Sequence, residues 1–127
     1  MLKNSKAFSS FSAADLPKSK DFYQDVLGLD IEETEMGILS IHLSGGGEVI
    51  IYLKPDHVPA AFTVLNFPVE DIDQAADELI SKGVDFEQYT GEIQTDEKGI
   101  CRTGDGPLIA WFRDPAGNIL SILQEVE

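Results

Sequence analysis

Apolar and polar residues alternate along several short segments of the chain and recur with helical spacing in two others. Strict alternation is typical of half-buried strands, whereas apolar residues at i, i+3, i+4 and i+7 indicate a helix with one buried face. The predicted buried positions of the later helix are Ile72, Ala75, Ala76, Leu79 and Ile80, and those of the earlier helix are Phe22, Tyr23, Val26 and Leu27. Asp15 and Asp71 are predicted to cap these helices, with Pro17 early in the first, and Gly28 and Gly83 to end them.

The elements occur twice in the same order. Asp15 and Asp71 lie 56 residues apart, and the later markers Gly28 and Gly83 lie 55 apart. An internal repeat of this length predicts two copies of one supersecondary unit. The predicted strands are 7–14, 30–35, 38–43 and 49–53 in the first copy, and 62–69, 85–89, 108–113 and 118–124 in the second. The chain is therefore predicted to be a single α+β domain, 1–127, made of two βαβββ modules at about 4–54 and 61–126 with a linker at 55–60.

The halves differ at residues 90–107, a long polar and Gly-rich insertion before the last hairpin. Ordered loops of this length often act as lids or binding loops. In the first half, Gly45-Gly46-Gly47 is predicted to form a hairpin turn.

Composition excludes several classes of function. The apolar share of 43% and the charged share of 25% indicate a soluble globular chain, without an apolar run long enough to span a membrane. The net charge of −14 argues against nucleic acid or an anionic membrane as a partner, because phosphates would be repelled. Cys101 is the single cysteine, and no signal segment is evident, so a reducing, cytoplasmic setting is expected.

Residues 106–125 predict a strand, a tight turn at Asp114-Pro115-Ala116-Gly117-Asn118 and a second strand. This hairpin, the two βαβββ modules and the segment Asp15-Leu16…Phe22-Tyr23…Leu27-Gly28-Leu29 resemble the vicinal oxygen chelate superfamily. That superfamily includes glyoxalase I, fosfomycin-resistance enzymes, extradiol dioxygenases and metal-free bleomycin-resistance proteins. The resemblance implies curved sheets of the glyoxalase/bleomycin-resistance type, whose paired modules enclose a cavity. It also implies a homodimer, and it leaves open whether modules pair within one chain or between two.

The resemblance further implies a divalent metal held by four side chains, usually His or Gln with Glu in each module. Counting from the shared markers places these positions at Phe8, Val64 and Ser121, with the fourth at about Tyr52, within one or two residues. None of these side chains is a good divalent ligand at neutral pH. The chain is therefore expected to hold no metal and no other cofactor.

The histidines and the cysteine, which could react or bind a metal, are more simply explained as structural or surface residues. His42 lies on a strand face with Ser40 and Ser44, which is either solvated or lines a cavity, and His57 is expected on the surface of the linker. A Ser-His-Asp triad stays open, although no Gly-x-Ser-x-Gly elbow supports it. Cys101 is favoured as a small half-buried residue, because no adjacent His would activate it.

Strand alternation extends the implied positions to a set of candidate ligand-binding residues. They are Phe8, Ser10, Tyr52, Lys54, Val64, Asn66, Trp111, Arg113 and Ser121. Together they predict a mostly apolar pocket with a few polar groups, which suits a small organic molecule. The alternative is that these residues fill a closed core. No catalytic residue is assigned.

Three functions remain open from the sequence. The favoured hypothesis is a metal-free member that binds a small organic molecule, in the manner of the bleomycin-resistance proteins. The second is a lyase or dioxygenase-type enzyme, with an atypical metal site or with acid/base catalysis by Tyr52, Lys54 or Arg113. The third is a structural or regulatory dimer without a ligand.

Overall fold

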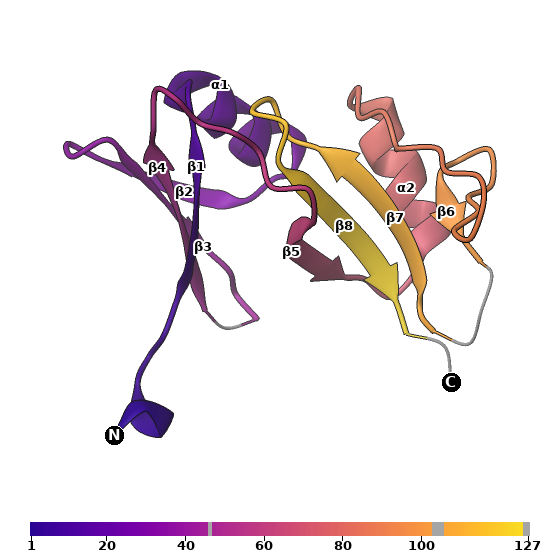
Figure 1. The fold of residues 1–127 in the computed structure, drawn as a ribbon, viewed down its shortest axis with the longest axis horizontal. Coiled ribbons are helices and arrows are strands. Elements are labelled where there is room, and N and C mark those ends of the chain that lie inside the picture. The colour runs from indigo at the N-terminus through magenta and orange to yellow at the C-terminus, as the bar shows by residue number, and fades with distance from the viewer. Residues whose placement is uncertain (46, 103–105, 126–127) are drawn as a thin grey trace. The chain divides into compact units, whose positions relative to one another are not determined.

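The computed structural model describes residues 1–45, 47–102 and 106–125. The chain divides into two compact units, Met1–Val58 (unit 1) and Pro59–Glu127 (unit 2). Each unit holds a four-stranded mixed sheet with a helix between its first two strands in the chain (Figure 1). The predicted α+β class with two modules is confirmed.

Unit 1 contains a sheet with the strand order β1-β4-β3-β2. Its elements are η1 (Leu2–Asn4), β1 (Ser9–Ala13), α1 (Leu16–Asp21), η2 (Phe22–Val26), β2 (Asp30–Thr34), β3 (Ile38–His42) and β4 (Glu48–Leu53). β1 runs parallel to β4, and the other neighbours are antiparallel. Of the predicted glycine hairpin after β3, Gly46 lies outside the described residues, and the amide of Leu43 donates to the carbonyl of Gly47 at 3.3 Å.

The helix of unit 1 begins at a side-chain cap and ends in a widened turn. The Asp15 carboxylate accepts from the backbone N–H of Lys18 at 3.1 Å, which confirms the predicted cap. After Asp21 the helix continues as the π-helical turn η2, closed by the Leu27 amide on the Phe22 carbonyl at 3.0 Å. Of the predicted buried face, Tyr23 is fully buried, with its ring 6.3 Å from that of Phe11, whereas Phe22, Val26 and Leu27 are half-buried.

Unit 2 repeats this arrangement with the strand order β5-β8-β7-β6. Its elements are β5 (Thr63–Pro68), α2 (Ile72–Ser81), β6 (Ile100–Cys101), β7 (Leu108–Arg113) and β8 (Ile119–Gln124). The core of this unit lies between α2 and one face of the sheet, where Ile72, Ala76, Phe112 and Leu120 are almost completely buried. Asp71 caps α2 as predicted, accepting from the Gln74 amide at 3.1 Å.

Two sequence-based predictions about unit 2 are wrong. Ile80, predicted to be buried, is 44% exposed. Each step of four residues turns about 40° around a helix, so Ile80 lies roughly 80° away from the buried Ile72. The predicted strand 85–89 is reduced to a single bridge, Phe86 to Phe112, and one further hydrogen bond, from the Glu87 amide to the Trp111 carbonyl at 2.8 Å.

The outer edge of β7 is therefore shared by two segments. Residues 86 and 87 occupy one end, and β6 occupies the other, with Ile100 opposite Ala110. Gly99 makes this sharing possible, because a Cβ there would lie 2.5 Å from the Cβ of Phe86. The insertion thus interrupts the edge strand instead of following it, and its residues 103–105 lie outside the described ones.

The turn between β7 and β8 is built around a buried carboxylate. Asp114 is 5% exposed, and its Oδ1 accepts from the amides of Ala116 and Asn118, both at 2.9 Å. Its Oδ2 accepts from the side-chain amide of Asn118 at 3.0 Å, and the Asp114 amide donates to the Asn118 carbonyl at 3.0 Å. Gly117 has the positive φ of +86° that this turn needs. The most prominent sequence motif is therefore structural.

None of the described helices is long and apolar enough to cross a membrane.

Replacing Asp114 with Ala should lower the free energy of unfolding by about 2–4 kcal/mol, because the buried amide of Asn118 and the half-buried amide of Ala116 lose their acceptor. Urea denaturation followed by circular dichroism measures this loss. Asp85→Ala, at an exposed position, is the matched control and should change stability by less than about 0.5 kcal/mol. A loss for Asp114→Ala no larger than the control's would contradict the structural role of the carboxylate.

Candidate functional site

The sheet of unit 2 has a face that α2 does not cover, and three predicted residues form one row across it. Asn66 on β5 pairs with Ser121 on β8, which pairs with Trp111 on β7. Because side chains alternate along each strand, all three lie opposite the face that packs against α2. We call this surface the ligand face. Figure 1 shows the three strands that carry it.

The polar part of the ligand face is a hydrogen bond between two neighbouring strands. The Ser121 hydroxyl, which is 0% exposed, donates to the side-chain oxygen of Asn66 at 2.6 Å. Asn66 is exposed, and its amide nitrogen has no partner among the described residues. It therefore offers two N–H donors to a ligand that lies on this face.

The apolar part of the ligand face is aromatic. The rings of Tyr89 and Trp111 meet edge to face, with centroids 5.6 Å apart and an interplanar angle of 77°. Both residues are half-buried, so part of each side chain is accessible. A half-exposed indole with a second ring at its edge presents a flat surface on which a planar molecule can stack.

Two further predicted residues, Arg113 and Val64, border this face. The charge of Arg113 is paired, and Val64 lies outside the regular pairing of its strand. The Arg113 guanidinium pairs with Glu87 and also donates to the Gly117 carbonyl at 3.2 Å. Val64 lies in a β-bulge, since Thr63 pairs with Ile119 while Leu65 already pairs with Leu120. Val64 is therefore the extra residue of β5 and has no partner opposite it on β8.

Unit 1 has a corresponding face opposite α1, which carries Ser10, Ser12, Ile50 and Tyr52. Tyr52 is 40% exposed, and Phe8, just before β1, is 64% exposed. Phe8 lines a shallow pocket of about 280 Å³, together with Ala7, Ser9, Leu43, Gly47, Glu48 and Val49. The candidate ligand-binding residues of unit 1 thus lie on its surface in two places. Phe8 lines the pocket, and Ser10 and Tyr52 lie on the face of the sheet opposite α1.

The strand registers identify which residue of unit 1 occupies the position equivalent to Ser121. Ser10 and Asn66 each lie five residues before a helix-capping aspartate. Ser10 pairs with Ile50, as Asn66 pairs with Ser121. Ile50 therefore corresponds to Ser121, two residues from the position predicted by counting.

These positions do not fit a divalent metal ion. Where the resemblance implies His, Gln or Glu, the chain carries alkyl, aromatic and hydroxyl groups, and the Ser121 hydroxyl donates to Asn66. Among the residues that the structure describes, no three His, Cys, Asp or Glu side chains are placed to hold a metal ion. His42 lies 3.2 Å from the Glu32 carboxylate on unit 1, without a third such group.

Of the candidate acid and base groups, Lys54 and Arg113 are each paired with a carboxylate. The Lys54 ammonium donates to Asp56 at 2.8 Å, and this hydrogen bond, with the charge of Asp56, raises the pKa of Lys54. A lysine held in its protonated form is a poor base at neutral pH. Arg113 is paired with Glu87.

Sequence reasoning missed three residues near these faces. In the predicted strand 85–89, alternation places Glu87 and Tyr89 on the face opposite Phe86, so the sequence did carry a signal for these two residues. His57, expected on the surface, lies with its Nδ1 2.5 Å from the Ser12 hydroxyl, and its Nε2 is buried. No signal in the sequence joins these two residues, which are 45 positions apart. Cys101 is half-buried in β6, as favoured above.

The fold described above agrees with that of known proteins to which this chain is similar. The family model described as the Glyoxalase/Bleomycin resistance protein/Dioxygenase superfamily matches residues 10–122. A superfamily member from Sphaerobacter thermophilus is 24% identical, with a TM-score of 0.69 over 98% of this chain and 100% of that chain. A search of curated proteins gave no match.

Two further solved structures are similar to this chain. TnmS3, an antibiotic binding protein from Streptomyces, is 22% identical, with a TM-score of 0.68 over 94% of this chain and 96% of that one. Lactoylglutathione lyase from Agrobacterium tumefaciens is 17% identical, with a TM-score of 0.68 over 93% and 92%.

Titration of chelator-treated protein with Zn²⁺, Ni²⁺ or Mn²⁺ should show no stoichiometric binding, because the donor groups do not suit these ions. Isothermal titration calorimetry is the measurement. Glu32→Gln is the control, since weak binding at the His42–Glu32 pair would disappear in it. Binding of about one ion per chain that survives this substitution would contradict the interpretation of the donor set.

Proposed function

The chain belongs to the Glyoxalase/Bleomycin resistance protein/Dioxygenase superfamily, and we propose that it is a member that binds a small planar aromatic molecule without a metal ion. The proposed binding surface is the ligand face of unit 2. The observation that carries the proposal is the single row Asn66–Ser121–Trp111, which places a hydrogen-bonding amide and an accessible indole on the two strands that flank β8.

The chemistry of the ligand face suits recognition of an uncharged or weakly charged ring system. Small-molecule sites combine mainly apolar walls with a few well-placed polar groups that fix orientation. Here Trp111 and Tyr89 supply the aromatic surface, and Asn66 supplies donors for a carbonyl or hydroxyl of the ligand. Arg113 is neutralised by Glu87, so it does not require an anionic ligand.

Binding is better supported than catalysis. Acid/base catalysis needs a group that gains and loses a proton near neutral pH, and Lys54 is held protonated by Asp56. The antibiotic binding protein TnmS3 has the same fold, so binding of a small molecule is a function compatible with this fold. A lyase or dioxygenase-type reaction is the alternative, because lactoylglutathione lyase also has this fold.

We also propose that the chain forms a homodimer in the cytoplasm. In the described sheets, β1 and β2 are edge strands of unit 1, and β5 and β6 are edge strands of unit 2. Unpaired strand edges favour association unless they are covered. A single cysteine, Cys101, suits a reducing compartment.

Light scattering coupled to size-exclusion chromatography should give twice the chain mass of 13.9 kDa, since the exposed edges favour association. The dimer should persist across protein concentrations in the micromolar range. A mass equal to one chain at the highest concentration would contradict this proposal.

Trp111→Leu should weaken binding of an uncharged planar dye such as Nile red by about tenfold, because it removes the stacking surface. Asn66→Ala should weaken it less, by about two- to fivefold, since it removes a single hydrogen-bonding group. Dye fluorescence during titration measures both affinities. Trp111→Phe, which keeps an aromatic face, should lie between the wild type and Trp111→Leu.

Two control variants locate the binding surface. Ile80→Ala, at an exposed position on α2, should leave the dye affinity unchanged. Tyr52→Phe tests the face of unit 1, because it removes the exposed phenol hydroxyl there. Loss of affinity in Tyr52→Phe with no effect of Trp111→Leu would overturn the assignment to unit 2. Conversion of the bound molecule to a product would favour the enzymatic alternative.

A further inference from the structure

Tyr89, which forms one wall of the ligand face, is held by the insertion and not by a strand. Its backbone amide donates to the Thr95 hydroxyl at 2.8 Å, and the Thr95 amide donates to the Tyr89 carbonyl at 3.1 Å. Both polar groups of the Tyr89 backbone are thus satisfied by one residue of the insertion. Thr95 therefore holds the Tyr89 backbone, from which the ring extends to Trp111.

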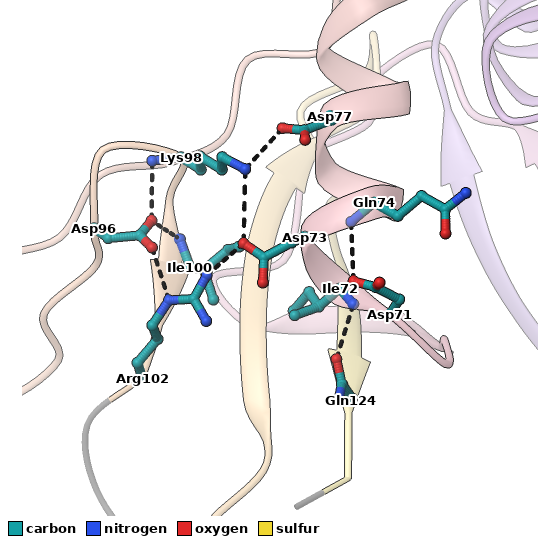
Figure 2. A network of polar contacts seen from close by, with 10 residues as sticks. All are labelled: Asp71, Ile72, Asp73, Gln74, Asp77, Asp96, Lys98, Ile100, Arg102 and Gln124. Carbon is teal, nitrogen blue, oxygen red and sulfur yellow. Dashed lines mark hydrogen bonds and ion pairs between the residues drawn. The ribbon is translucent and has the colours of Figure 1, made fainter.

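The same part of the insertion is tied to α2 by a network of charged side chains (Figure 2). We call it the α2 latch, and it consists of Asp73, Asp77, Asp96, Lys98 and Arg102. The Arg102 guanidinium bridges two of its carboxylates, donating to Asp73 at 2.6 Å and to Asp96 at 2.9 Å. Lys98 lies 3.0 Å from Asp77 and 3.6 Å from Asp73, one helical turn apart on α2.

Asp96 connects the latch to Tyr89. Its Oδ1 accepts from the backbone amides of Lys98 and Ile100, both at 2.9 Å, while its Oδ2 accepts from Arg102. Burial acts to raise the pKa of Asp96, but the hydrogen bonds from Arg102 and from these two amides outweigh it, and the pKa is lowered. Asp96 is therefore charged at neutral pH, and it directly follows Thr95 in the chain.

We propose that the α2 latch positions Tyr89 against Trp111, and that Arg102 and Asp73 are thus positioning residues for the ligand face. The path runs from α2 through Arg102 and Asp96 to Thr95, and from Thr95 through two hydrogen bonds to Tyr89. Between the latch residues Lys98 and Arg102, Gly99 packs closely against Phe86, where an added Cβ would lie 2.5 Å from the Cβ of Phe86. The consequence for ligand affinity rests on the proposed function, whereas the positioning of Tyr89 does not.

The latch should respond to ionic strength. The side chains of Arg102, Asp73 and Asp96 are 41%, 47% and 33% exposed, so their attraction is partly screened by water and salt. Raising NaCl from about 0.05 M to about 1 M shortens the screening length from more than 10 Å to about 3 Å. Salt should therefore release Tyr89 while the hydrogen-bonded ladder of β7 and β8 stays intact.

The test uses the full chain without a ligand and two variants, Arg102→Gln and Asp73→Asn. Hydrogen exchange at the amides of Tyr89 and Ile100 should speed up about three- to tenfold in both, as expected when exposed ion pairs are lost. Exchange at Phe112 and Leu120, which pair across β7 and β8, should stay as in the wild type. Trp111 is the single tryptophan of the chain, so its emission should shift to the red and be quenched more by acrylamide.

Control variants separate positioning from general destabilisation. Lys20→Gln removes an ion pair of similar exposure in unit 1, with Glu33 at 3.2 Å, and should leave Trp111 emission unchanged. Arg102→Lys keeps the charge and should restore part of the wild-type emission. Wild-type protein at high salt should resemble Arg102→Gln.

Wild-type exchange at Tyr89 in both latch variants, together with unchanged Trp111 emission, would overturn the proposal. So would an equal acceleration at Phe112 and Leu120, because it would show general unfolding. Nile red affinity should fall in the latch variants but not in Lys20→Gln, and an unchanged affinity would overturn the link to the ligand face. Absence of dye binding in the wild type would instead overturn the proposed function, while exchange and emission still decide on the latch.

Discussion

The buried carboxylate of Asp114 is the constraint on which the ligand face depends. It holds the β7–β8 turn closed through Ala116 and Asn118, and the Asp114 amide pairs with the Asn118 carbonyl. The register fixed there continues along both strands and places Trp111 opposite Ser121. A slip of one residue would send the indole to the face that packs against α2 and would expose Phe112. The turn at Asp114 has no binding role itself, but it thus determines the positions of Trp111 and Ser121 on the ligand face.

The face positioned in this way is completed by a segment that the repeat does not share. In unit 1 the edge beside β3 is the regular strand β2, whereas in unit 2 the edge beside β7 is divided between residues 86–87 and β6. The chain leaves the sheet after residue 87 and returns to it at β6, and Lys98 just before β6 and Arg102 just after it both contact α2. Tyr89 lies at the start of the insertion. The segment that distinguishes unit 2 from unit 1 therefore also provides the second aromatic ring of the ligand face.

Local chemistry allowed much of the fold to be predicted from the sequence, and long-range geometry accounts for the rest. Asp15 and Asp71 were recognisable as caps because a cap depends on residues three positions away. Ile80 was misplaced because helical drift accumulates beyond two turns. Ser121 was found by counting from the markers of the resemblance, and Asn66 and Trp111 by alternation, but their alignment in one row depends on registers that only the paired strands reveal. The contact of Ser12 with His57 has no local signature.

Membership of the superfamily is compatible with both binding proteins and enzymes, so the account depends on what the ligand face contacts. The most direct measurement is a titration of isotope-labelled protein with Nile red, followed by ¹H–¹⁵N NMR. The account predicts saturable shifts of the single indole N–H, that of Trp111, and of the Asn66 side-chain amide, with the signals of α2 unmoved. Saturable shifts confined to α2 or to unit 1, with the Trp111 and Asn66 signals unchanged, would contradict it.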